Sequence, residues 1–379
     1  MLSIWERNAF IQYDHIIIGS GIVGLTTAYY LKEKFPAQSV LILERGLLPT
    51  GASTRNAGFA CMGSPSELLD DLSHRSEQEV VDLFRLRKNG LTRLSSILGH
   101  AAMGYKAEGS HELFFEDDTH VIDQLPYLNQ LLRSEVGSDA YIIRNEKIET
   151  FGLNKSKVKA MVENCCEGQI DTGLMIKNLI LLVTSLGVEI KTGCLVQSFL
   201  DTGNGAEVVC LNSFAVDEIV FKSKTLTICT NGFATQLLPT LDVVPGRGQV
   251  LITKPIAGLN LKGIFHFHQG YYYCREYNGC VLIGGGRNTD FEKETTMELT
   301  LNDEIQQNLV EQLRSFIIPN QEFEIDMQWS GIMAFGQSKQ PIIQQYSQHI
   351  FIGVRMGGMG IAIGSEVGFQ LANLIATAH

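Results

Sequence analysis

The segment Gly19–Gly24, which reads G-S-G-I-V-G, constrains the fold more than any other part of the chain. It follows an isoleucine-rich run, Tyr13–Ile18, and leads into a stretch of helical composition, Ile22–Lys34. Glycines at this spacing allow a tight turn from strand to helix, a close approach of a ligand to the backbone, and close packing of the helix on the strand. A second apolar run, Val40–Glu44, comes next. The first 45 residues therefore predict a β-α-β unit, which implies a parallel sheet.

The same segment predicts a binding site for a dinucleotide. The first N–H groups of a helix carry a partial positive charge and receive a pyrophosphate well. Glu44 lies 20 residues after Gly24, at the end of the second strand. A carboxylate at that position accepts hydrogen bonds from ribose hydroxyl groups and repels a 2′-phosphate, which argues against NADP. The alternative interpretation is an ordinary β-α-β turn that holds no nucleotide.

Two further glycine-rich segments extend this prediction. Thr50–Phe59, T-G-A-S-T-R-N-A-G-F, is a loop whose N–H groups can wrap a diphosphate or the edge of a flavin. Gly353–Gly364, G-V-R-M-G-G-M-G-I-A-I-G, lies between a predicted strand and a predicted helix. Its N–H groups can face an acceptor that becomes anionic, such as the N1–C2=O edge of a reduced flavin. The alternatives are a surface loop for the first segment and close helix packing for the second.

Composition and charge exclude several classes of protein. The chain has 30 basic and 41 acidic residues, and this net charge of −11 repels the phosphates of nucleic acids. No apolar run approaches the ~18 residues of a membrane span, and the N-terminus lacks the apolar core of a signal peptide. We therefore expect a cytoplasmic protein with no integral membrane segment. None of the eight cysteines forms a C-x-x-C pair, so we expect reduced thiols and no metal site.

The order of predicted elements gives an α/β fold with two domains. Both ends of the chain alternate strands and helices, whereas Val243–Phe335 is mostly β, with one helix at about Asn302–Phe316. We predict a Rossmann-like domain with a parallel sheet and an inserted α+β domain with a mostly antiparallel sheet. The first domain comprises residues 1–75, 155–240 and 338–379, and the second comprises residues 76–154 and 241–337.

The three glycine clusters, in this order, resemble those of the D-amino-acid oxidase superfamily of FAD enzymes. That group includes glycine oxidase, sarcosine oxidase and related amine oxidases and dehydrogenases. The resemblance covers nearly the whole chain, and the start, Ser3–Glu6, is similar to that of a bacterial subgroup. It further rests on the segments Glu167–Gly173, Thr227–Phe233, Val244–Val250 and Trp329–Phe335. The first domain would accordingly bind FAD and the second the substrate.

The resemblance implies that FAD binds non-covalently along the three clusters. The pyrophosphate would lie on the first cluster, the adenosine ribose at Glu44, and the isoalloxazine against the third cluster. We expect the thiol of Cys61, just after the second cluster, to be free rather than attached to the flavin. The residues implied in FAD binding are Gly19, Gly21, Ile22, Val23, Gly24, Glu44, Arg45, Ser53, Thr54, Asn56, Ala57, Gly58, Val196, Thr230, Asn231, Gly232, Gly357, Gly358, Met359, Gly360 and Ile361.

The activity implied is oxidation of the C–N bond of a small amine or amino acid, by hydride transfer to the flavin. Oxygen or another carrier would then accept the electrons. Amino-acid oxidases of this group usually carry an arginine in the segment that matches Trp329–Phe335, but this chain has Ile332, Met333 and Ala334 there. The usual carboxylate ligand is therefore missing. Two alternatives stay open: FAD-dependent oxidation of a 2-hydroxy acid, and a flavin-binding subunit without catalysis.

Replacement substrate ligands are expected in G-Y-Y-Y-C-R-E, Gly270–Glu276. The resemblance implies a substrate-facing tyrosine on this strand. Tyr272 fits best, and a shift of one residue would select Tyr271 or Tyr273 and turn the other face to the site. Arg275 is expected to reach a carboxylate from the same strand. We therefore name Tyr272, Tyr273 and Arg275 as substrate-binding candidates, and no acid–base residue, because a neutral amine needs none.

Other polar residues are weaker candidates. Arg287, after a run of three glycines, is a weaker candidate for the substrate carboxylate, and its alternative is a turn residue; Arg355 precedes the flavin-facing loop and can lie near the ring. Arg247 is expected to be structural. His266 and His268 alternate on one predicted strand and should share a face, where one of them can line the pocket. No Cys, Asp or Glu pattern accompanies them that would indicate a metal ion.

Overall fold

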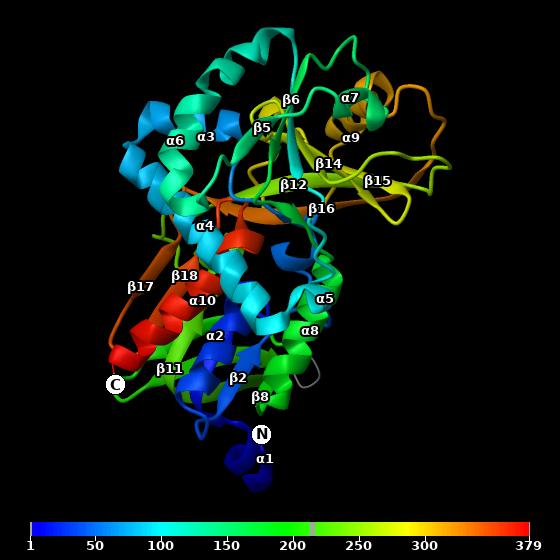
Figure 1. The fold of residues 1–379 in the computed structure, drawn as a ribbon. Helices are drawn as coiled ribbons and strands as arrows, with labels where there is room; N and C mark the ends of the chain where they lie inside the picture. The colour runs from blue at the N-terminus through cyan, green and yellow to red at the C-terminus, as the bar shows by residue number, and fades with distance from the viewer. Residues whose placement is uncertain (1, 213–216, 379) are drawn as a thin grey trace.

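The computed structural model describes residues 2–212 and 217–378, and two eight-stranded sheets organise it (Figure 1). The core of the first sheet is parallel, in the order β18-β11-β1-β2-β8, and β17 joins its β18 edge in antiparallel orientation. An antiparallel pair, β9 and β10, extends from β11. The strands are β1 (Gln12–Ile18), β2 (Val40–Leu43), β8 (Val188–Lys191), β9 (Val196–Asp201), β10 (Ala206–Asn212), β11 (Asp217–Ile228), β17 (Ile342–Gln345) and β18 (Ile350–Val354).

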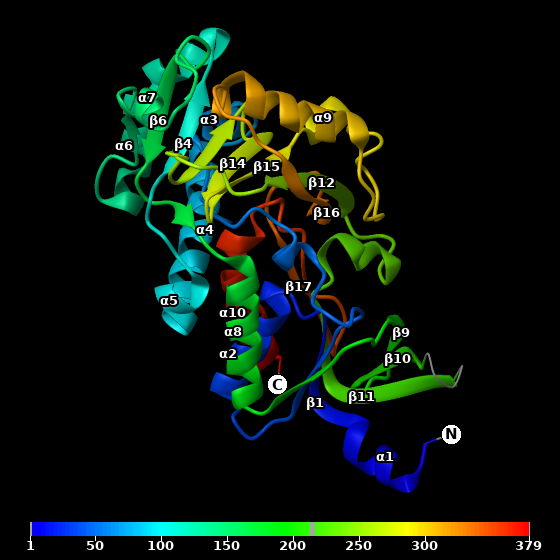
Figure 2. The same cartoon turned by 90° about the vertical axis from the view of Figure 1, so that its right-hand side faces the viewer.

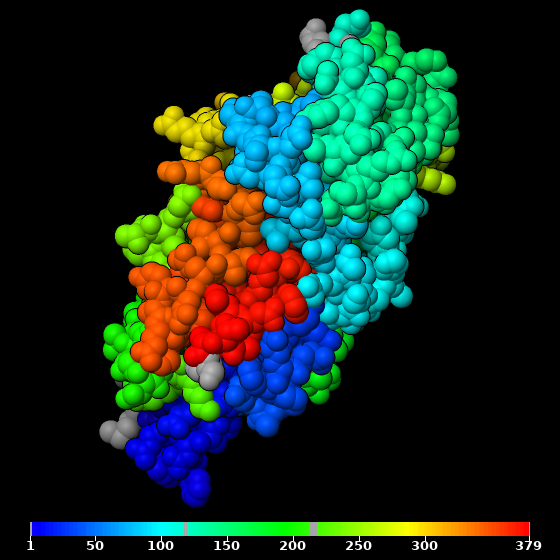
Figure 3. Space-filling model, turned by 60° about the vertical axis from the view of Figure 1, so that its left-hand side comes forward, coloured from blue at the N-terminus to red at the C-terminus, as the bar shows by residue number. Residues whose placement is uncertain are grey.

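One face of the first sheet is covered by helices. Strand residues such as Ile17 and Ile42 pack there against α2 and α10, which explains the continuous apolar runs of strands buried on both faces. Gly90 of α4 lies so close to α10 that a Cβ atom would be 1.9 Å from the carbonyl oxygen of Ala362. In Figure 3, α10 (red) lies between the blue and the cyan segments. The helices of this layer are α2 (Ile22–Lys34), α4 (Glu77–Leu98), α8 (Thr172–Ser185) and α10 (Gly360–Thr377).

The second sheet has the order β16-β12-β15-β14-β13-β4-β6-β5, and all its pairs are antiparallel except β13 with β4. The helix α9 (Asp303–Gln312) lies on one face of it (Figure 2), and Ile305 and Leu309 of this helix are part of the core beneath. The strands are β4 (Ser110–Phe114), β5 (Tyr141–Ile143), β6 (Ala160–Asn164), β12 (Val244–Thr253), β13 (Ile264–Phe267), β14 (Tyr272–Tyr277), β15 (Cys280–Gly285) and β16 (Ile325–Phe335).

Shorter elements connect these layers. They are α1 (Ile4–Phe10), α3 (Pro65–His74), α5 (His100–Met103), α6 (Leu125–Val136), α7 (Lys147–Thr150), the two-residue strands β3 (Phe59–Ala60) and β7 (Gly168–Gln169), the 3-10 helices η1 (Ala52–Thr54), η2 (Glu116–Gln124), η3 (Asn231–Gln236) and η4 (Arg287–Thr289), and a π-helical turn, η5 (Leu313–Ile317). Within the described ranges, no helix is both long and apolar enough to cross a membrane.

The two sheets confirm the predicted fold class, a Rossmann-like parallel sheet combined with a mostly antiparallel one. The predicted division into domains differs from the sheets at one place. Strand β6 pairs with β4 and β5 in the second sheet, although residues 155–240 were assigned to the first domain. A five-residue strand is too short for its composition to decide between the sheets, and its pairing partners decide where it lies. The domain boundaries themselves stay a prediction.

Candidate functional site

A cavity of about 520 Å³ lies between the two sheets. Its walls include the carboxyl ends of β1, β2 and β11, at Ile18, Leu43 and Cys229, and residues of the second sheet such as Val250 and Tyr273. Crevices outside the carboxyl ends of parallel strands are where open α/β sheets bind their ligands. The volume is within the ~300–1,000 Å³ typical of small-molecule sites.

The turn from β1 into α2 forms one wall of this cavity. Gly19 has φ +104°, a backbone conformation that other residues rarely adopt, and a Cβ atom there would be 2.9 Å from the carbonyl oxygen of Cys229. Ile22, the first residue of α2, donates its N–H to Ser53 Oγ at 3.1 Å. Gly24 does not line the cavity, because it packs so tightly that a Cβ would lie 2.0 Å from Gly19 O. The start of α2 therefore faces the cavity, and the third glycine serves packing.

Glu44 lies at the end of β2 and lines the cavity, as predicted from its spacing. Its Oε2 accepts hydrogen bonds from Ser20 N at 3.0 Å and from Ser20 Oγ at 2.7 Å, and its Oε1 accepts one from Gly46 N at 2.9 Å. These donors fix the buried carboxylate and leave further lone pairs for a ligand. Beside it, the guanidinium carbon of Arg45 lies 3.6 Å from the ring centroid of Phe233.

The second cluster folds into η1 and a loop that is held mainly by its own side chains. Asn56 Nδ2 donates to the carbonyl oxygens of Ala52 and Ser53 at 2.9 and 3.0 Å, and Asn56 Oδ1 accepts from Gly58 N at 2.7 Å. The Thr54 hydroxyl donates to Pro49 O, so Thr54 points into the loop rather than into the cavity. Gly58 also does not line the cavity, and its carbonyl oxygen accepts a hydrogen bond from the Ile170 amide.

The third cluster brings the start of α10 to the same cavity. Gly357, Gly358 and Gly360 all line it. The first N–H groups of a helix have no partner within the helix, so this end is a site for an acceptor group. The loop is held by Asn231, whose Oδ1 accepts hydrogen bonds from the backbone N–H groups of Arg355 and Met356 at 3.1 and 3.2 Å.

These features fit a dinucleotide with a flavin. Two helix starts, α2 and α10, open into one cavity, and the buried hydroxyl of Thr230 lines it without a hydrogen-bond partner among the described residues. All residues implied in FAD binding line the cavity, except Gly24, Thr54 and Gly58. Their contact with FAD stays a prediction.

The tyrosines of β14 alternate between the cavity and the core. Tyr273 lines the cavity, and so does Tyr271 just before the strand. Tyr272, the tyrosine that fitted best by sequence, is turned to the opposite face, where it is buried and stacks on Phe267 at a centroid distance of 5.3 Å. The expectation for Tyr272 was therefore wrong by one residue of strand register. A shift of one residue was the alternative that the sequence left open, and it places Tyr271 and Tyr273, instead of Tyr272, on the cavity side of the sheet.

Arg275 is also not where the sequence placed it. Its guanidinium is buried and does not line the cavity. Its Nη1 donates to three carbonyl oxygens, of Ala57 at 3.2 Å, Gly58 at 3.0 Å and Ile170 at 2.7 Å. Arg275 thus joins β14 of the second sheet to the second glycine cluster, away from the cavity.

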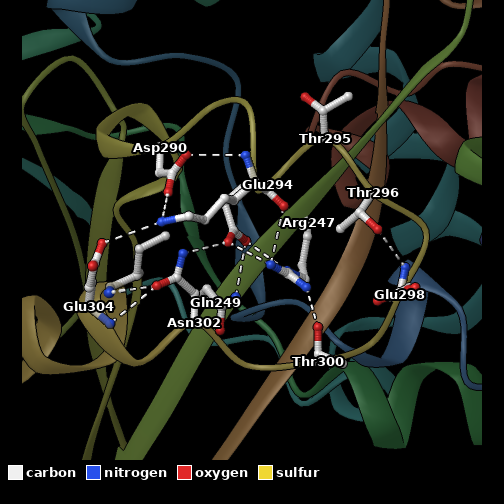
Figure 4. Close-up of polar contacts among 12 residues, drawn as sticks. Arg247, Gln249, Asp290, Glu294, Thr295, Thr296, Glu298, Thr300, Asn302 and Glu304 are labelled. Atoms are coloured by element: carbon white, nitrogen blue, oxygen red, sulfur yellow. Dashed lines mark hydrogen bonds and ion pairs between the residues drawn. The ribbon is translucent and has the colours of Figure 1, made fainter.

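Two other arginines are structural as well. Arg355 Nη1 pairs with the carboxylate of Asp242, and its Nε donates to Gln340 O at 3.0 Å. Arg247, as expected, is part of a buried network shown in Figure 4. Its Nε and Nη2 each lie 2.8 Å from the Glu294 carboxylate in a bidentate pair.

Arg287, by contrast, lines the cavity. His266 does so too, buried at the end of β13, and its ring stands edge-on to Phe59 at a centroid distance of 5.1 Å. The expectation that His266 and His268 share a face was wrong. Strand β13 ends at Phe267, and His268 has φ +50°, so its ring turns outward and stacks on Phe115.

Several cavity residues were not named from the sequence. Arg55 and Phe59 lie within the second cluster, and Met333 and Phe335 lie within Trp329–Phe335, so their motifs were recognised while their side chains were not assigned. Glu67, Gln269 and Lys339 also line the cavity, and no sequence pattern marks them. Cys61 lines it with a free thiol, the pKa of which is raised by burial.

Comparisons with known proteins give a family from one family model and a shared fold from solved structures. A family model described as FAD dependent oxidoreductase matches residues 14–374. A search of curated protein sequences finds no match. A similar solved structure is L-proline dehydrogenase from P. horikoshii, with a TM-score of 0.77 at 18% identity over 97% of this chain and 94% of that chain. Glycine oxidase from Geobacillus kaustophilus has a TM-score of 0.76 at 18% identity over 97% of this chain and 95% of that chain. L-amino acid deaminase from Proteus myxofaciens in complex with anthranilate has a TM-score of 0.75 at 15% identity over 97% of this chain and 91% of that chain. At these identities the likeness establishes a shared fold.

Proposed function

Because the chain belongs to the family of FAD-dependent oxidoreductases, we propose that it binds FAD non-covalently and oxidises the C–N bond of a small amine or amino acid. The observation that carries the proposal is the convergence of three separate glycine clusters and two helix starts on one cavity. An NAD-dependent enzyme needs the first cluster only. The second and third clusters have a ready use when the ligand carries an isoalloxazine ring.

Different residues of the chain would bind different parts of the cofactor. The N–H groups at the start of α2 would receive the pyrophosphate, and the carboxylate of Glu44 would accept hydrogen bonds from the adenosine ribose. At the other end, N–H groups around Gly358 and Ile361, at the start of α10, would lie against the ring. When bound, FAD accepts the hydride from the carbon that bears the nitrogen, and water hydrolyses the imine that is left.

The substrate end of the cavity combines apolar walls with a few polar groups. Met333, Phe335 and Met359 line it and exclude water from the reacting bond. Burial lowers the pKa of His266, so its ring is neutral at pH 7. Its Nε2 has no hydrogen-bond partner among the described residues. With the proton on Nδ1, this Nε2 can accept a hydrogen bond from the N–H of a neutral substrate amine and so orient it.

The experiment is a substrate screen on the purified protein. We expect the protein to be yellow, to release FAD on denaturation, and to be bleached anaerobically by amines or amino acids. Bleaching by 2-hydroxy acids alone would replace this proposal with the alternative chemistry. A protein that binds FAD but is bleached by neither class would be a flavin-binding subunit, and a colourless protein that cannot be reconstituted with FAD would refute the proposal.

A variant pair checks the location of the cofactor. A Cβ atom at Gly21 would lie 2.9 Å from Ser53 Oγ, at the point where the pyrophosphate is expected to approach. We expect Gly21→Ala to fold and to lose FAD. The control is Gly173→Ala in the first turn of α8, where the nearest neighbouring atom would be 3.4 Å away and no cofactor contact is expected.

A further inference from the structure

We propose that Arg287 is the receptor for an anionic group of the substrate, so that the substrate is an amine that also carries a carboxylate. This inference rests on the proposed function and narrows its substrate class. Arg287 is the first residue of η4, directly after β15, and it lines the cavity together with Phe335 and Gly285. It was only a weak candidate by sequence, because an arginine after three glycines reads as a turn residue.

The guanidinium of Arg287 stacks on aromatic rings and has no carboxylate partner among the described residues. Its central carbon lies 4.3 Å from the ring centroid of Phe335 and 4.9 Å from that of Phe291. Its Nε is buried without a hydrogen-bond partner, and among the described residues no carboxylate pairs with it. Burial lowers the pKa of this guanidinium. Arg287 is half-buried, and a half-buried cation with unpaired donors favours an anion that enters from outside.

Other arginines around the cavity are already engaged. Arg55 Nη1 donates to Ser330 O at 2.9 Å, and Arg275 and Arg355 are bonded to carbonyl oxygens and to Asp242. Arg45 stacks over Phe233 beside Glu44, at the end expected to hold adenosine. At the substrate end, Arg287 is therefore the arginine whose donors face the cavity unused.

Glu294 is close enough to act on the charge of Arg287, but its carboxylate is engaged in the hydrogen-bond network of Figure 4. The Glu294 carboxylate accepts the bidentate pair from Arg247, a bond from Gln249 Nε2 at 3.0 Å and a bond from Asn302 Nδ2 at 3.0 Å. The backbone is tied too, since Arg247 N donates to Glu294 O at 2.7 Å. The network saturates Glu294 and anchors the segment that carries Arg287 and Phe291. Arg287 is thus preorganised for an incoming anion.

The sheet order explains how Arg287 can replace a ligand on β16. Strand β12 lies between β16 and β15. Within Trp329–Phe335, the segment in which the family usually carries its arginine, the Met333 side chain lies over Gly248 of β12, with its Cε 3.0 Å from where a Cβ would be. At Gly246, two residues earlier, a Cβ would be 2.9 Å from Arg287 Nε and 2.5 Å from a Phe335 ring carbon. The absence of a side chain at Gly246 lets Arg287 reach across β12 and stack on Phe335.

The chemistry that this site recognises is a carboxylate. A planar guanidinium with several free N–H donors binds both oxygens of a carboxylate in a fork, which an ammonium does not. A simple monoamine would leave Arg287 unsatisfied. Amino acids and 2-hydroxy acids share the carboxylate, and the bleaching screen described above separates these two sources.

The test uses the FAD-bound protein and three aromatic probes: benzoate, anthranilate and the uncharged amine aniline. Dissociation constants are measured by calorimetry, which does not need the flavin signal, and by changes in flavin absorbance. We expect both carboxylates to bind at least tenfold more tightly than aniline, because a hydrogen bond to a charged group is strong. Arg287→Met should remove this difference while leaving aniline binding unchanged, and Arg287→Lys should restore part of it.

Arg314→Met is the matched control, because Arg314 also stacks on an aromatic ring, Phe323, but lies outside the cavity. It should bind all three probes as the wild type does. The inference is overturned if the wild type binds the carboxylates no better than aniline, or if Arg287→Met weakens all three probes equally. When FAD is bound and amines bleach it, either result refutes only the role of Arg287. A protein without FAD refutes the proposed function separately.

Discussion

Substitution of Arg275 by methionine separates the role that the sequence suggested from the role that the structure gives it. Arg275 Nη1 carries two hydrogens for three acceptors, the carbonyl oxygens of Ala57, Gly58 and Ile170. Methionine keeps most of the apolar stem and removes these donors. Gly58 O keeps its bond from the Ile170 amide, so two buried carbonyl groups lose the donor that the structure gives them.

The expected loss of stability follows from those two groups. A buried acceptor left without a partner costs about 1–3 kcal/mol, so two cost about 2–6 kcal/mol. The variant also avoids the cost of burying a guanidinium, which offsets part of this loss. We therefore expect Arg275→Met to lower the free energy of unfolding by about 2–4 kcal/mol. Because Ala57 lines the cavity, FAD affinity should fall by about tenfold as well.

The assays are urea unfolding of the FAD-free protein and FAD titration followed by flavin fluorescence. Arg275→Lys keeps the charge and loses the planar fork, so it should lie between the wild type and Arg275→Met. Tyr277→Phe on the same strand is a milder comparison, since it removes one bond, from the Tyr277 hydroxyl to Asp171 Oδ2 at 3.0 Å. The reasoning is refuted if Arg275→Met unfolds like the wild type and instead loses binding of benzoate, since that pattern belongs to a substrate ligand.

Three further predictions test other parts of the structure. Gly90→Ala should lower the free energy of unfolding by about 1–3 kcal/mol despite its better helix propensity, since α4 must move away from α10. Gly173→Ala should instead raise it by about 0.5 kcal/mol, and urea unfolding measures both. Glu44→Ala leaves three N–H and O–H donors without their acceptor, and FAD titration should show affinity at least tenfold weaker. Burial raises the pKa of Glu112 to about 8, so the stability that its protonated form gives the fold is fully present below about pH 4.5 and is lost as the pH rises to 8. The free energy of unfolding of Glu112→Gln, measured relative to the wild type, should therefore increase between pH 5 and 8. A difference that stays constant over this range would contradict the prediction.

The cofactor end of the site was predictable because it depends on backbone. Tight turns and close approaches require glycine, so the sequence itself marks where the chain must come near a ligand or a neighbour. Glu44 was found by spacing, because a strand, a turn and a helix have nearly fixed lengths. The exceptions, Thr54 and Gly58, lie in the loop of the second cluster, where the face that a residue presents depends on side-chain bonds such as those of Asn56. Spacing does not reveal such bonds.

The substrate end was less predictable because it depends on tertiary contacts. The choice between Tyr272 and Tyr273 depends on where β14 begins, and the faces of His266 and His268 depend on where β13 ends. Boundaries of this kind are the least certain part of any reading of a sequence. Lys339 has no marking pattern, since it reaches the cavity from the loop before β17 and pairs there with Asp71 at 2.7 Å.

Arg275 and Arg287 show why the type of residue alone does not identify a ligand. Both lie beside β15, both carry the same charge, and the sequence favoured the first of them. In the structure, Arg275 meets three carbonyl oxygens that need a donor, whereas Arg287 lies against two aromatic rings, and the Glu294 carboxylate is saturated by other donors. Arg287 is half-buried and its Nε has no partner among the described residues, so we expect this arginine, rather than Arg275, to receive the substrate anion. We therefore expect the substrate anion at Arg287, at the start of η4, and not at Arg275 on β14. Arg275→Met should lower the free energy of unfolding, whereas Arg287→Met should weaken only the binding of carboxylates.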